Sequence, residues 1–228
     1  MNALYAEHFG FSENPFSLAP DPRFLYQSEG HREALAHLVY GVRGEGGIIL
    51  LTGEVGAGKT TVFRCLLEQL ADKTRIAFVV HPKLSVDELL ATICDEFGIS
   101  LPDEGGGTKR YVDSIHRYLL AAAAEDCRAI VVIDEAQNLS SDVLEQLRLL
   151  TNLETNRRKL LQIILIGQPE LRGIVEKRSM RQLAQRITAR YHLGPLERED
   201  VHPYIRHRLS VAGVSADLIS PTLARSVY

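Results

Sequence analysis

Eight consecutive residues have the types and spacing that suit the binding of a polyphosphate. Residues 53–60 read GEVGAGKT, which fits the pattern G-x-x-x-x-G-K-[ST]. Glycines let the backbone curl so that its N–H groups point at an anion, and a following helix turns its positive end toward the same anion. Lys59 would place a charge on the β- and γ-phosphates, and the hydroxyl of Thr60 could ligate Mg²⁺. The segment predicts a phosphate loop for ATP with Mg²⁺, made of Gly53, Glu54, Val55, Gly56, Ala57, Gly58, Lys59, Thr60 and Thr61.

Two acids follow an apolar stretch further along the chain. Residues 129–137 read AIVVIDEAQ, so Asp134 and Glu135 come directly after a predicted buried strand. Ligands of parallel sheets bind at the carboxyl ends of the strands. We expect Asp134 to hold Mg²⁺ through water and Glu135 to polarise an attacking water as general base. The pair therefore predicts hydrolysis of the bound nucleotide.

A glutamine ends the next apolar stretch. Residues 165–171 read LIGQPEL, and the amide of Gln168 could contact the γ-phosphate or the attacking water. The alternative is a polar loop residue that stands before a helix beginning at Pro169.

An arginine-rich segment comes later, with RSMRQLAQRITAR at residues 178–190. Arg181, Arg186 and Arg190 are candidates for an arginine finger that reaches the phosphates bound by a neighbouring subunit. We favour Arg186 because it stands just before a predicted strand. The alternatives are a solvated basic helix and a contact with nucleic acid.

The elements that must position these side chains alternate along the chain. The apolar patterns predict strands over 48–52, 75–80, 128–133, 160–166 and 189–193. They predict helices over 31–42, 59–71, 85–97, 109–124, 140–150, 169–175 and 197–211. This alternation is typical of an α/β fold, here a three-layer α/β/α P-loop NTPase with a five-stranded parallel sheet.

Three units are expected within the 228 residues. Residues 1–30 combine prolines with aromatic side chains, which predicts an arm packed on the core rather than a free tail. Residues 31–195 form the nucleotide-binding core. Residues 196–228 turn purely helical and predict the start of a small helical lid.

Composition narrows the class of protein. The net charge is -3, which disfavours nucleic acid as a partner, and 45% of the residues are hydrophobic, as in a soluble domain. Cys65, Cys94 and Cys127 are too far apart for a metal site and are interpreted as core residues in a reducing compartment. The sequence shows neither a signal peptide nor an apolar stretch of about 18 residues, so we expect a cytoplasmic location.

The combined motifs resemble those of the AAA+ ATPases. Within that group the leader FGFSENPFSLAPDPRFLYQSEGHREALAHLVYGV, the loop GEVGAGKTT and the segments IDEAQNL, LIGQPEL and LAQRITARYHLGPL are similar to secretion ATPases of the GspA/ExeA type. Pilus-biogenesis ATPases of the MshM type share this pattern. The resemblance covers nearly the whole chain.

Several expectations come from this resemblance alone. It implies a bacterial homo-oligomer, joined through its nucleotide interface, that uses ATP to assemble a secretion or pilus machine in the cell envelope. The chain would be the cytoplasmic domain of a longer inner-membrane protein whose other regions contact peptidoglycan. The family lid continues to a G-x-P-R motif that this sequence does not reach, which also implies a piece of a longer protein.

The resemblance also assigns residues. Lys59 and Thr60 match Walker A, and Asp134 and Glu135 match Walker B. Gln168 takes the sensor 1 position and Arg186 the finger position. Part of the leader, near Tyr26 and His31, would lie beside the adenine.

Two other functions remain open from the sequence. A DNA-associated AAA+ regulator of the transposition type has similar motifs, and Lys83, Lys109 and the arginine-rich segment could contact DNA. A nucleotide-gated scaffold with little hydrolysis is the other alternative, although the presence of Glu135 disfavours it. An ABC-type ATPase is excluded because an LSGGQ-like signature is absent, and a DEAD-type helicase would need a second motor domain.

Overall fold

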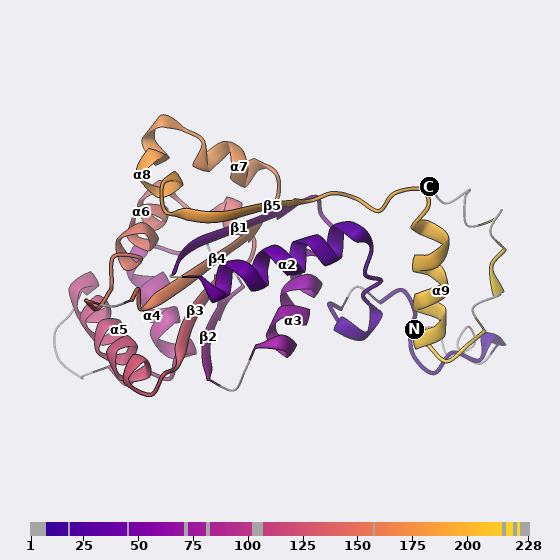
Figure 1. Ribbon diagram of the computed structural model, residues 1–228, viewed down its shortest axis with the longest axis horizontal. Helices are drawn as coiled ribbons and strands as arrows, with labels where there is room; N and C mark the ends of the chain where they lie inside the picture. The colour runs from indigo at the N-terminus through magenta and orange to yellow at the C-terminus, as the bar shows by residue number, and fades with distance from the viewer. Residues whose placement is uncertain are drawn as a thin grey trace.

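Five parallel strands form the central sheet of the computed structural model, in the order β2-β3-β4-β1-β5 (Figure 1). The structure describes residues 8–17, 19–44, 46–70, 73–80, 83–101, 107–156, 158–215, 218–220 and 223. The strands are β1 (Gly47–Gly53), β2 (Thr74–Val79), β3 (Arg128–Ile133), β4 (Leu161–Gly167) and β5 (Ile187–Leu193). The predicted five-stranded parallel sheet is thus confirmed.

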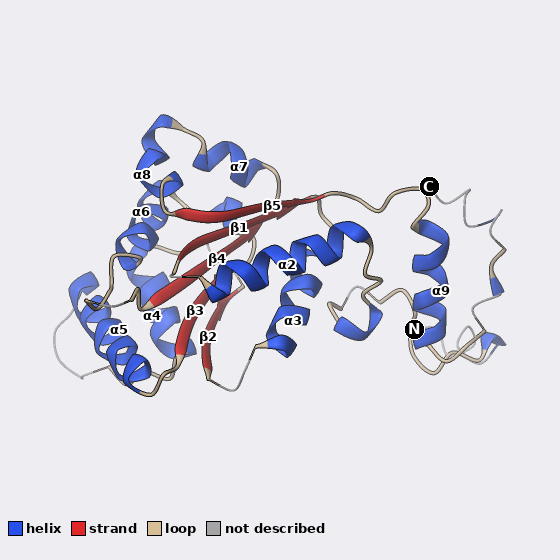
Figure 2. Cartoon of the chain, in the orientation of Figure 1, coloured by secondary structure: helices blue, strands red, loops and turns tan. Residues whose placement is uncertain are grey.

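Helices cover both faces of this sheet, which confirms the three-layer arrangement (Figure 2). The α-helices are α2 (Glu29–Arg43), α3 (Lys59–Gln69), α4 (Val86–Glu96), α5 (Gly107–Ala124), α6 (Ser141–Leu150), α7 (Glu170–Val175), α8 (Arg181–Ala184) and α9 (Val201–Val211). Short 3-10 helices are η1 (Pro22–Phe24), η2 (Ala136–Asn138) and η3 (Arg178–Met180).

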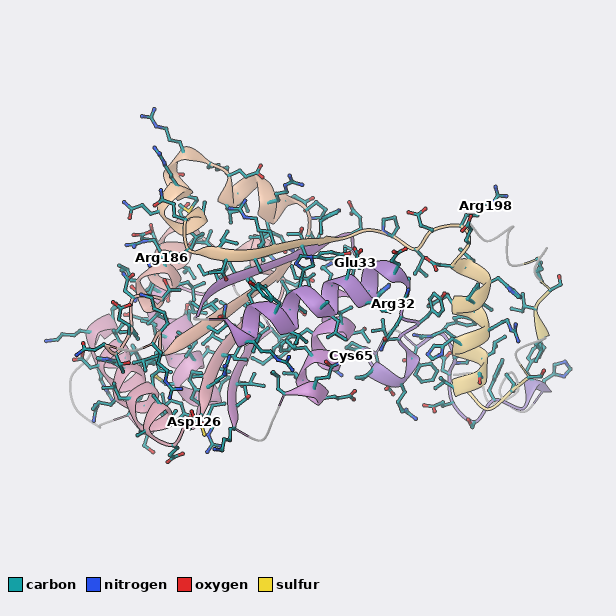
Figure 3. The ribbon with its side chains drawn as sticks, in the orientation of Figure 1. Arg32, Glu33, Cys65, Asp126, Arg186 and Arg198 are labelled. Atoms are coloured by element: carbon teal, nitrogen blue, oxygen red, sulfur yellow. The ribbon has the colours of Figure 1, made fainter. Side chains whose placement is uncertain are left out.

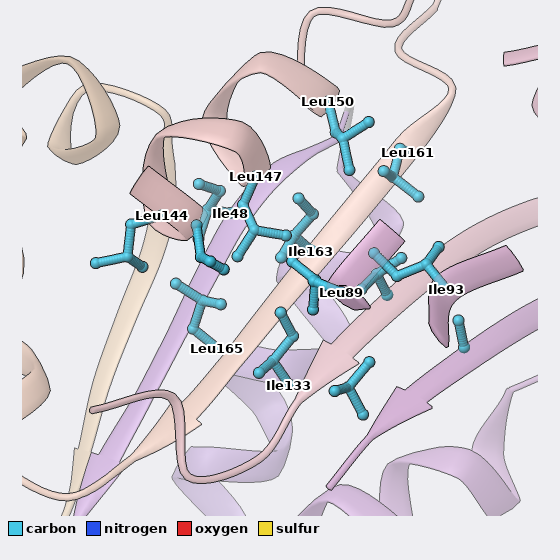
Figure 4. Packing of buried hydrophobic residues seen from close by; sticks show 14 of the residues in the cluster. Ile48, Leu89, Ile93, Ile133, Leu144, Leu147, Leu150, Leu161, Ile163 and Leu165 are labelled. Carbon is cyan, nitrogen blue, oxygen red and sulfur yellow. The ribbon is translucent and has the colours of Figure 1, made fainter. Parts of the chain in front are cut away.

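The central strands are apolar throughout because each face of the sheet has its own core. Ile48 and Leu50 of β1 pack with α4, α5 and α6, whereas Ile49 and Leu51 pack with α2 and α3. Figure 4 shows the first of these cores, in which leucines of α6 lie over β1 and β4. Successive side chains of a strand point to opposite faces, so a strand covered on both sides reads as a continuous apolar run.

Several element boundaries differ from the predicted ones. Helix α2 begins at Glu29 rather than residue 31, because Ser28 caps it with its hydroxyl on the N–H of His31. Strand β5 begins at Ile187 rather than residue 189, where it pairs with Ile48 of β1. Helix α9 begins at Val201 rather than residue 197, because the backbone N–H of Asp200 bonds to the carbonyl of Glu197 in a turn.

The N-terminal arm packs against α9 as well as against the core. Phe11 and Phe24 form a separate apolar cluster with Ile205, Leu209 and Ala212. The helix η1 also contacts α3, and Arg64 of α3 donates a 2.9 Å hydrogen bond to the carbonyl of Pro20, two residues before η1. The proposed unit boundaries at residues 30 and 195 stay predictions, and most of the predicted lid after residue 215 lies outside the described residues.

Arg208 of α9 holds the arm through its guanidinium group. It donates to the carbonyl oxygens of Pro15, Ser17 and Phe24, at 2.9 Å for Ser17 and 3.3 Å for Phe24. The same guanidinium lies 4.7 Å from the centroid of the Phe24 ring, a cation–π contact. These contacts tie the proline-rich arm to a helix near the other end of the sequence.

Candidate nucleotide-binding site

The phosphate loop joins β1 to α3 as a tight turn at the carboxyl edge of the sheet. Its backbone folds back so that the N–H of Ala57 bonds to the carbonyl of Glu54 at 3.2 Å. Gly56 and Gly58 have φ values of +80° and +91°, which glycine adopts without strain. A Cβ at Gly58 would also lie only 2.9 Å from Nε2 of His31. Both glycines are therefore required by the turn, and Gly58 also by the close approach of α2.

Lys59 begins α3 and folds back over the loop. Its side chain is only 6% exposed, and Nζ donates 2.8 Å hydrogen bonds to the carbonyls of Gly53 and Glu54. Burial lowers the pKa of Lys59, while the carboxylates of Glu135, Asp134 and Glu54 act in the opposite direction. The amine thus lies at the loop between backbone carbonyls and nearby acids, at a place where phosphate oxygens could replace the carbonyls as its partners.

Thr60 and Asp134 meet directly, although 74 residues separate them. The hydroxyl of Thr60 donates to Oδ2 of Asp134 at 2.9 Å, and Oδ1 accepts from the backbone N–H of Glu135 at 2.9 Å. Asp134 is 7% exposed and follows β3, whose pairing with β2 continues in the bond from its N–H to the carbonyl of Val79. The sheet therefore holds this carboxylate beside the first turn of α3.

This donor set fits Mg²⁺. A hydroxyl and a carboxylate are hard oxygen ligands, and Mg²⁺ in nucleotide sites keeps several waters and takes phosphate oxygens as further ligands. Among the described residues there is no group of three or more histidine, cysteine or acidic side chains that could hold a metal ion alone. A magnesium ion at Thr60 and Asp134 would take waters and phosphate oxygens as its remaining ligands.

Glu135 occupies an unusual backbone position after β3. Its φ of 54° and ψ of 35° are left-handed, which costs energy for a residue with a side chain. Its Oε2 accepts from Nε2 of Gln137 at 2.6 Å and from Nε2 of Gln168 at 3.3 Å. The backbone N–H of Gln168 in turn donates to Oε1 of Gln137 at 3.1 Å. Two amides from different elements thus converge on one carboxylate.

The sequence analysis missed Gln137, because in this segment it assigned roles to Asp134 and Glu135 only. A weak signal existed, because a polar amide three residues past Asp134 lies close to the sheet edge whenever the chain turns sharply there. The left-handed turn at Glu135 that brings this amide back is not visible in the residue pattern, since non-glycine residues rarely adopt it.

A cavity of about 630 Å³ connects the phosphate loop to the arm and to α9. It is lined by loop residues and Glu135, by arm residues that include Phe24, Leu25 and Tyr26, and by His31, Pro195, Leu196, Tyr204 and Arg208. Tyr26 donates to Oδ1 of Asp200 at 3.3 Å. The residues expected beside the adenine therefore line the same cavity as the residues expected around the phosphates.

His31 supports the phosphate loop from behind. Its Nε2 lies 3.0 Å from the carbonyl of Ala57, and its Nδ1 lies 2.6 Å from Oγ of Ser28. A carbonyl can only accept, so Nε2 bears the hydrogen and Nδ1 accepts from the Ser28 hydroxyl. Burial is the main cause that lowers the pKa of His31, which favours this neutral form.

Arg186 lies at the amino ends of the strands, whereas the phosphate loop of the same chain lies at their carboxyl ends. Its carbonyl accepts from the N–H of Ile48 at the start of β1, and its Nη2 donates to Oδ1 of Asn152 at 2.8 Å. Figure 3 shows the Arg186 side chain where β5 begins. Arg190 bonds to the carbonyl of Ala184 at 3.3 Å, and Arg181 is exposed. A finger at Arg186 would therefore have to serve a different copy of the chain.

Comparison with known proteins identifies the family. Residues 42–175 match the AAA domain. The chain belongs to the AAA domain family. It is 54% identical over 225 residues to General secretion pathway protein A of Aeromonas hydrophila, a match that covers 99% of this chain and 41% of that protein. The chain therefore spans less than half the length of this relative, and its resemblance to secretion ATPases of the GspA type is confirmed.

Solved structures share the fold. Cdc6p from Pyrobaculum aerophilum superposes with a TM-score of 0.70 at 17% identity, over 93% of this chain and 57% of that one. The Aeropyrum pernix ORC2 protein, in its ADPNP-ADP complexes, gives a TM-score of 0.68 at 17% identity, over 93% and 59% of the two chains. At this identity the likeness extends to the α/β fold of nucleotide-binding AAA proteins and no further.

In the part of the chain that the structure describes, no helix combines the length and the apolar character needed to cross a bilayer.

Proposed function

We propose that this chain binds ATP with Mg²⁺ and hydrolyses it, as the ATPase domain of a longer bacterial protein of the general secretion pathway A type. The observation that supports this most directly is the contact between Thr60 and Asp134 at 2.9 Å, with Glu135 next along the chain. Membership of the AAA domain family and the GspA-like relative support the same reading.

Each residue of the site has a separate task in this proposal. Mg²⁺ would be held by Thr60 directly and by Asp134 through water, and it would neutralise charge on the β- and γ-phosphates. Lys59 exchanges the carbonyls of Gly53 and Glu54 for phosphate oxygens, which carry more negative charge. The phosphate loop and the N-terminus of α3 cradle the remaining phosphate oxygens with backbone N–H groups.

Glu135 and Gln168 act on the attacking water. The carboxylate of Glu135 accepts a proton from the water as the water oxygen bonds to the γ-phosphorus. The bond from that phosphorus to the β–γ bridging oxygen breaks, and ADP leaves with phosphate as the other product. The amide of Gln168 contacts the γ-phosphate or the attacking water. Nε2 of Gln168 lies 3.3 Å from Oε2 of Glu135, so one water could be in reach of both side chains.

The relative supports a proposal for the role in the cell. We infer a homo-oligomer in which Arg186 of one copy reaches the nucleotide of the next, because Arg186 lies far from the phosphate loop of its own chain. The cycle would drive assembly of a secretion or pilus machine, from a cytoplasmic domain of an inner-membrane protein. Contacts with peptidoglycan would belong to other regions of that protein.

The test is the rate of ATP hydrolysis with and without Mg²⁺, for the wild-type chain and for Glu135→Gln. Loss of a general base lowers turnover by about 10²- to 10⁴-fold, while the affinity for ATP stays near the wild-type value. Glu68→Gln, an exposed substitution on α3, is the matched control. A Glu135→Gln variant that turns over at the wild-type rate would refute the proposed chemistry, and ATP binding without turnover in the wild type would favour the scaffold alternative.

A further inference from the structure

The amide of Gln137 joins two parts of the site that the fold supplies separately. Glu135 follows β3, and Gln168 follows the neighbouring strand β4. Gln137 donates from Nε2 to Oε2 of Glu135 at 2.6 Å and accepts at Oε1 from the backbone N–H of Gln168 at 3.1 Å. The nitrogen of this planar amide therefore bonds to the segment after β3, and its oxygen bonds to the segment after β4.

The surroundings fix the position of this amide. Ala136, fully buried, anchors η2 against the sheet and α7, so the backbone of Gln137 has little freedom. A Cβ at Gly167 would lie 2.8 Å from Oε1 of Gln137, so the absence of a side chain there is what permits the close approach. Gln137 is thus held from its backbone side and from its amide side.

The hydrogen bonds leave one oxygen of Glu135 available. Both Gln137 and Gln168 donate to Oε2, and within the described part of the chain Oε1 of Glu135 receives no donor. A carboxylate with one oxygen fixed presents the other in a defined direction, which is what a general base needs before water arrives. The left-handed backbone at Glu135 also depends on these surrounding contacts, because a strained residue relaxes when its contacts are lost.

We propose that Gln137 is a positioning residue for hydrolysis. It aims Oε1 of Glu135 at the attacking water and keeps the carboxylate in register with the backbone of Gln168. A shift of the β4–α7 connection on contact with the γ-phosphate would then move the carboxylate as well. This inference rests on the proposed ATPase function, and it assigns Gln137 no contact with the nucleotide.

Two substitutions at Gln137 separate the parts of this role, and a third substitution elsewhere is the control. Gln137→Ala removes both hydrogen bonds. Gln137→Glu keeps the size and an acceptor for the N–H of Gln168 but replaces the donor facing Glu135 with a like charge, which is unfavourable. Gln69→Ala, an exposed glutamine at the end of α3, is the control.

The experiment measures kcat, KM and the affinity for a fluorescent ATP analogue. For Gln137→Ala and Gln137→Glu, kcat falls by about 10- to 100-fold, the factor expected when a hydrogen bond to a charged group is lost. Affinity for the analogue stays within about twofold, because the residue touches no part of the phosphate loop. A loss of affinity equal to the loss of kcat, or a wild-type kcat in both variants, overturns the proposal.

A double-substitution cycle distinguishes positioning from a general structural effect. If Gln137 acts through Glu135, then Gln137→Ala lowers kcat no further in a Glu135→Gln background. Independent, multiplying losses would contradict the proposal. The cycle also separates the two claims. If Glu135→Gln has the wild-type kcat, the proposed function is refuted. If Glu135→Gln lowers kcat but Gln137→Ala does not, only the role of Gln137 is refuted.

Discussion

The hydroxyl of Thr60 donates a 2.9 Å hydrogen bond to Oδ2 of Asp134, which links the first turn of α3 to the end of β3. Thr60 owes its position to the turn of the phosphate loop, and Asp134 owes its position to the pairing of β3 with β2. The two oxygens meet because parallel strands end at one edge of the sheet and α3 begins at that edge.

Asp134→Asn tests this pair as a magnesium site. The substitution keeps the size of the side chain but removes its charge, so the part of ATP affinity that depends on Mg²⁺ should fall by about 10- to 100-fold. Titration of ATP with and without Mg²⁺ measures that part directly. Asp113→Asn, an exposed substitution on α5, should leave it unchanged. Equal affinities of Asp134→Asn and wild type in the presence of Mg²⁺ would speak against the site.

Arg186→Ala tests the finger in trans. Loss of an arginine finger lowers turnover by about 10³- to 10⁵-fold, and the loss appears only where subunits meet. The turnover per subunit should rise with protein concentration in the wild type and stay low and flat in the variant. Arg172→Ala, an exposed arginine paired with Glu176 on α7, is the control. A wild-type rate that is flat with concentration and unaffected by Arg186→Ala would remove the finger assignment.

Asn152 gives the same hypothesis a second test. Its Oδ1 accepts from Nη2 of Arg186 at 2.8 Å, so it restrains the direction of the guanidinium. Asn152→Ala should lower turnover less than Arg186→Ala and should have no further effect when the two are combined. Steady-state rates of the single and double variants, measured at high protein concentration, decide this.

Arg208→Lys tests how the arm is attached. One ammonium group cannot reach the carbonyls of Pro15, Ser17 and Phe24 in the geometry of a guanidinium fork, so we expect a loss of about 1–3 kcal/mol in unfolding free energy. The arm should also be cleaved faster by a protease, and ATP should bind more weakly because arm residues line the cavity. Chemical denaturation and limited proteolysis check this against Arg198→Ala, an exposed change before α9. Unchanged stability and cleavage would show that the apolar cluster alone holds the arm.

The sequence predicted the sheet and the glycine-rich turn between β1 and α3 because their signals are local. A strand buried on both faces must be apolar throughout, and acids directly after it, such as Asp134, can only lie at the strand end. The contacts of single side chains were not predictable in this way. The amide of Gln137 depends on a left-handed turn, and Arg208 contacts carbonyl groups more than 180 residues away. The start of α2 also differed from the predicted one, because the cap at Ser28 depends on side-chain geometry that a periodic pattern does not contain.

His31 predicts how stability depends on pH. Burial lowers the pKa of His31 in the folded chain, whereas an unfolded histidine has a pKa of about 6.5. Below about pH 7 the unfolded state therefore binds more protons than the folded state, so the unfolding free energy falls as pH decreases and stops falling below the folded pKa. Above that window neither state binds the proton and His31 contributes no pH dependence.

His31→Gln isolates this effect. Glutamine does not titrate and its amide can still donate toward the carbonyl of Ala57, so the variant should lose less stability than the wild type between about pH 7 and pH 5. The difference amounts to about 1.4 kcal/mol for each unit between the folded and unfolded pKa values. Denaturant unfolding at several pH values measures it, with His37→Gln, an exposed change on the same helix, as the control. If wild type and His31→Gln lose stability in parallel over this range, His31 does not contribute to the pH dependence, and the prediction is wrong.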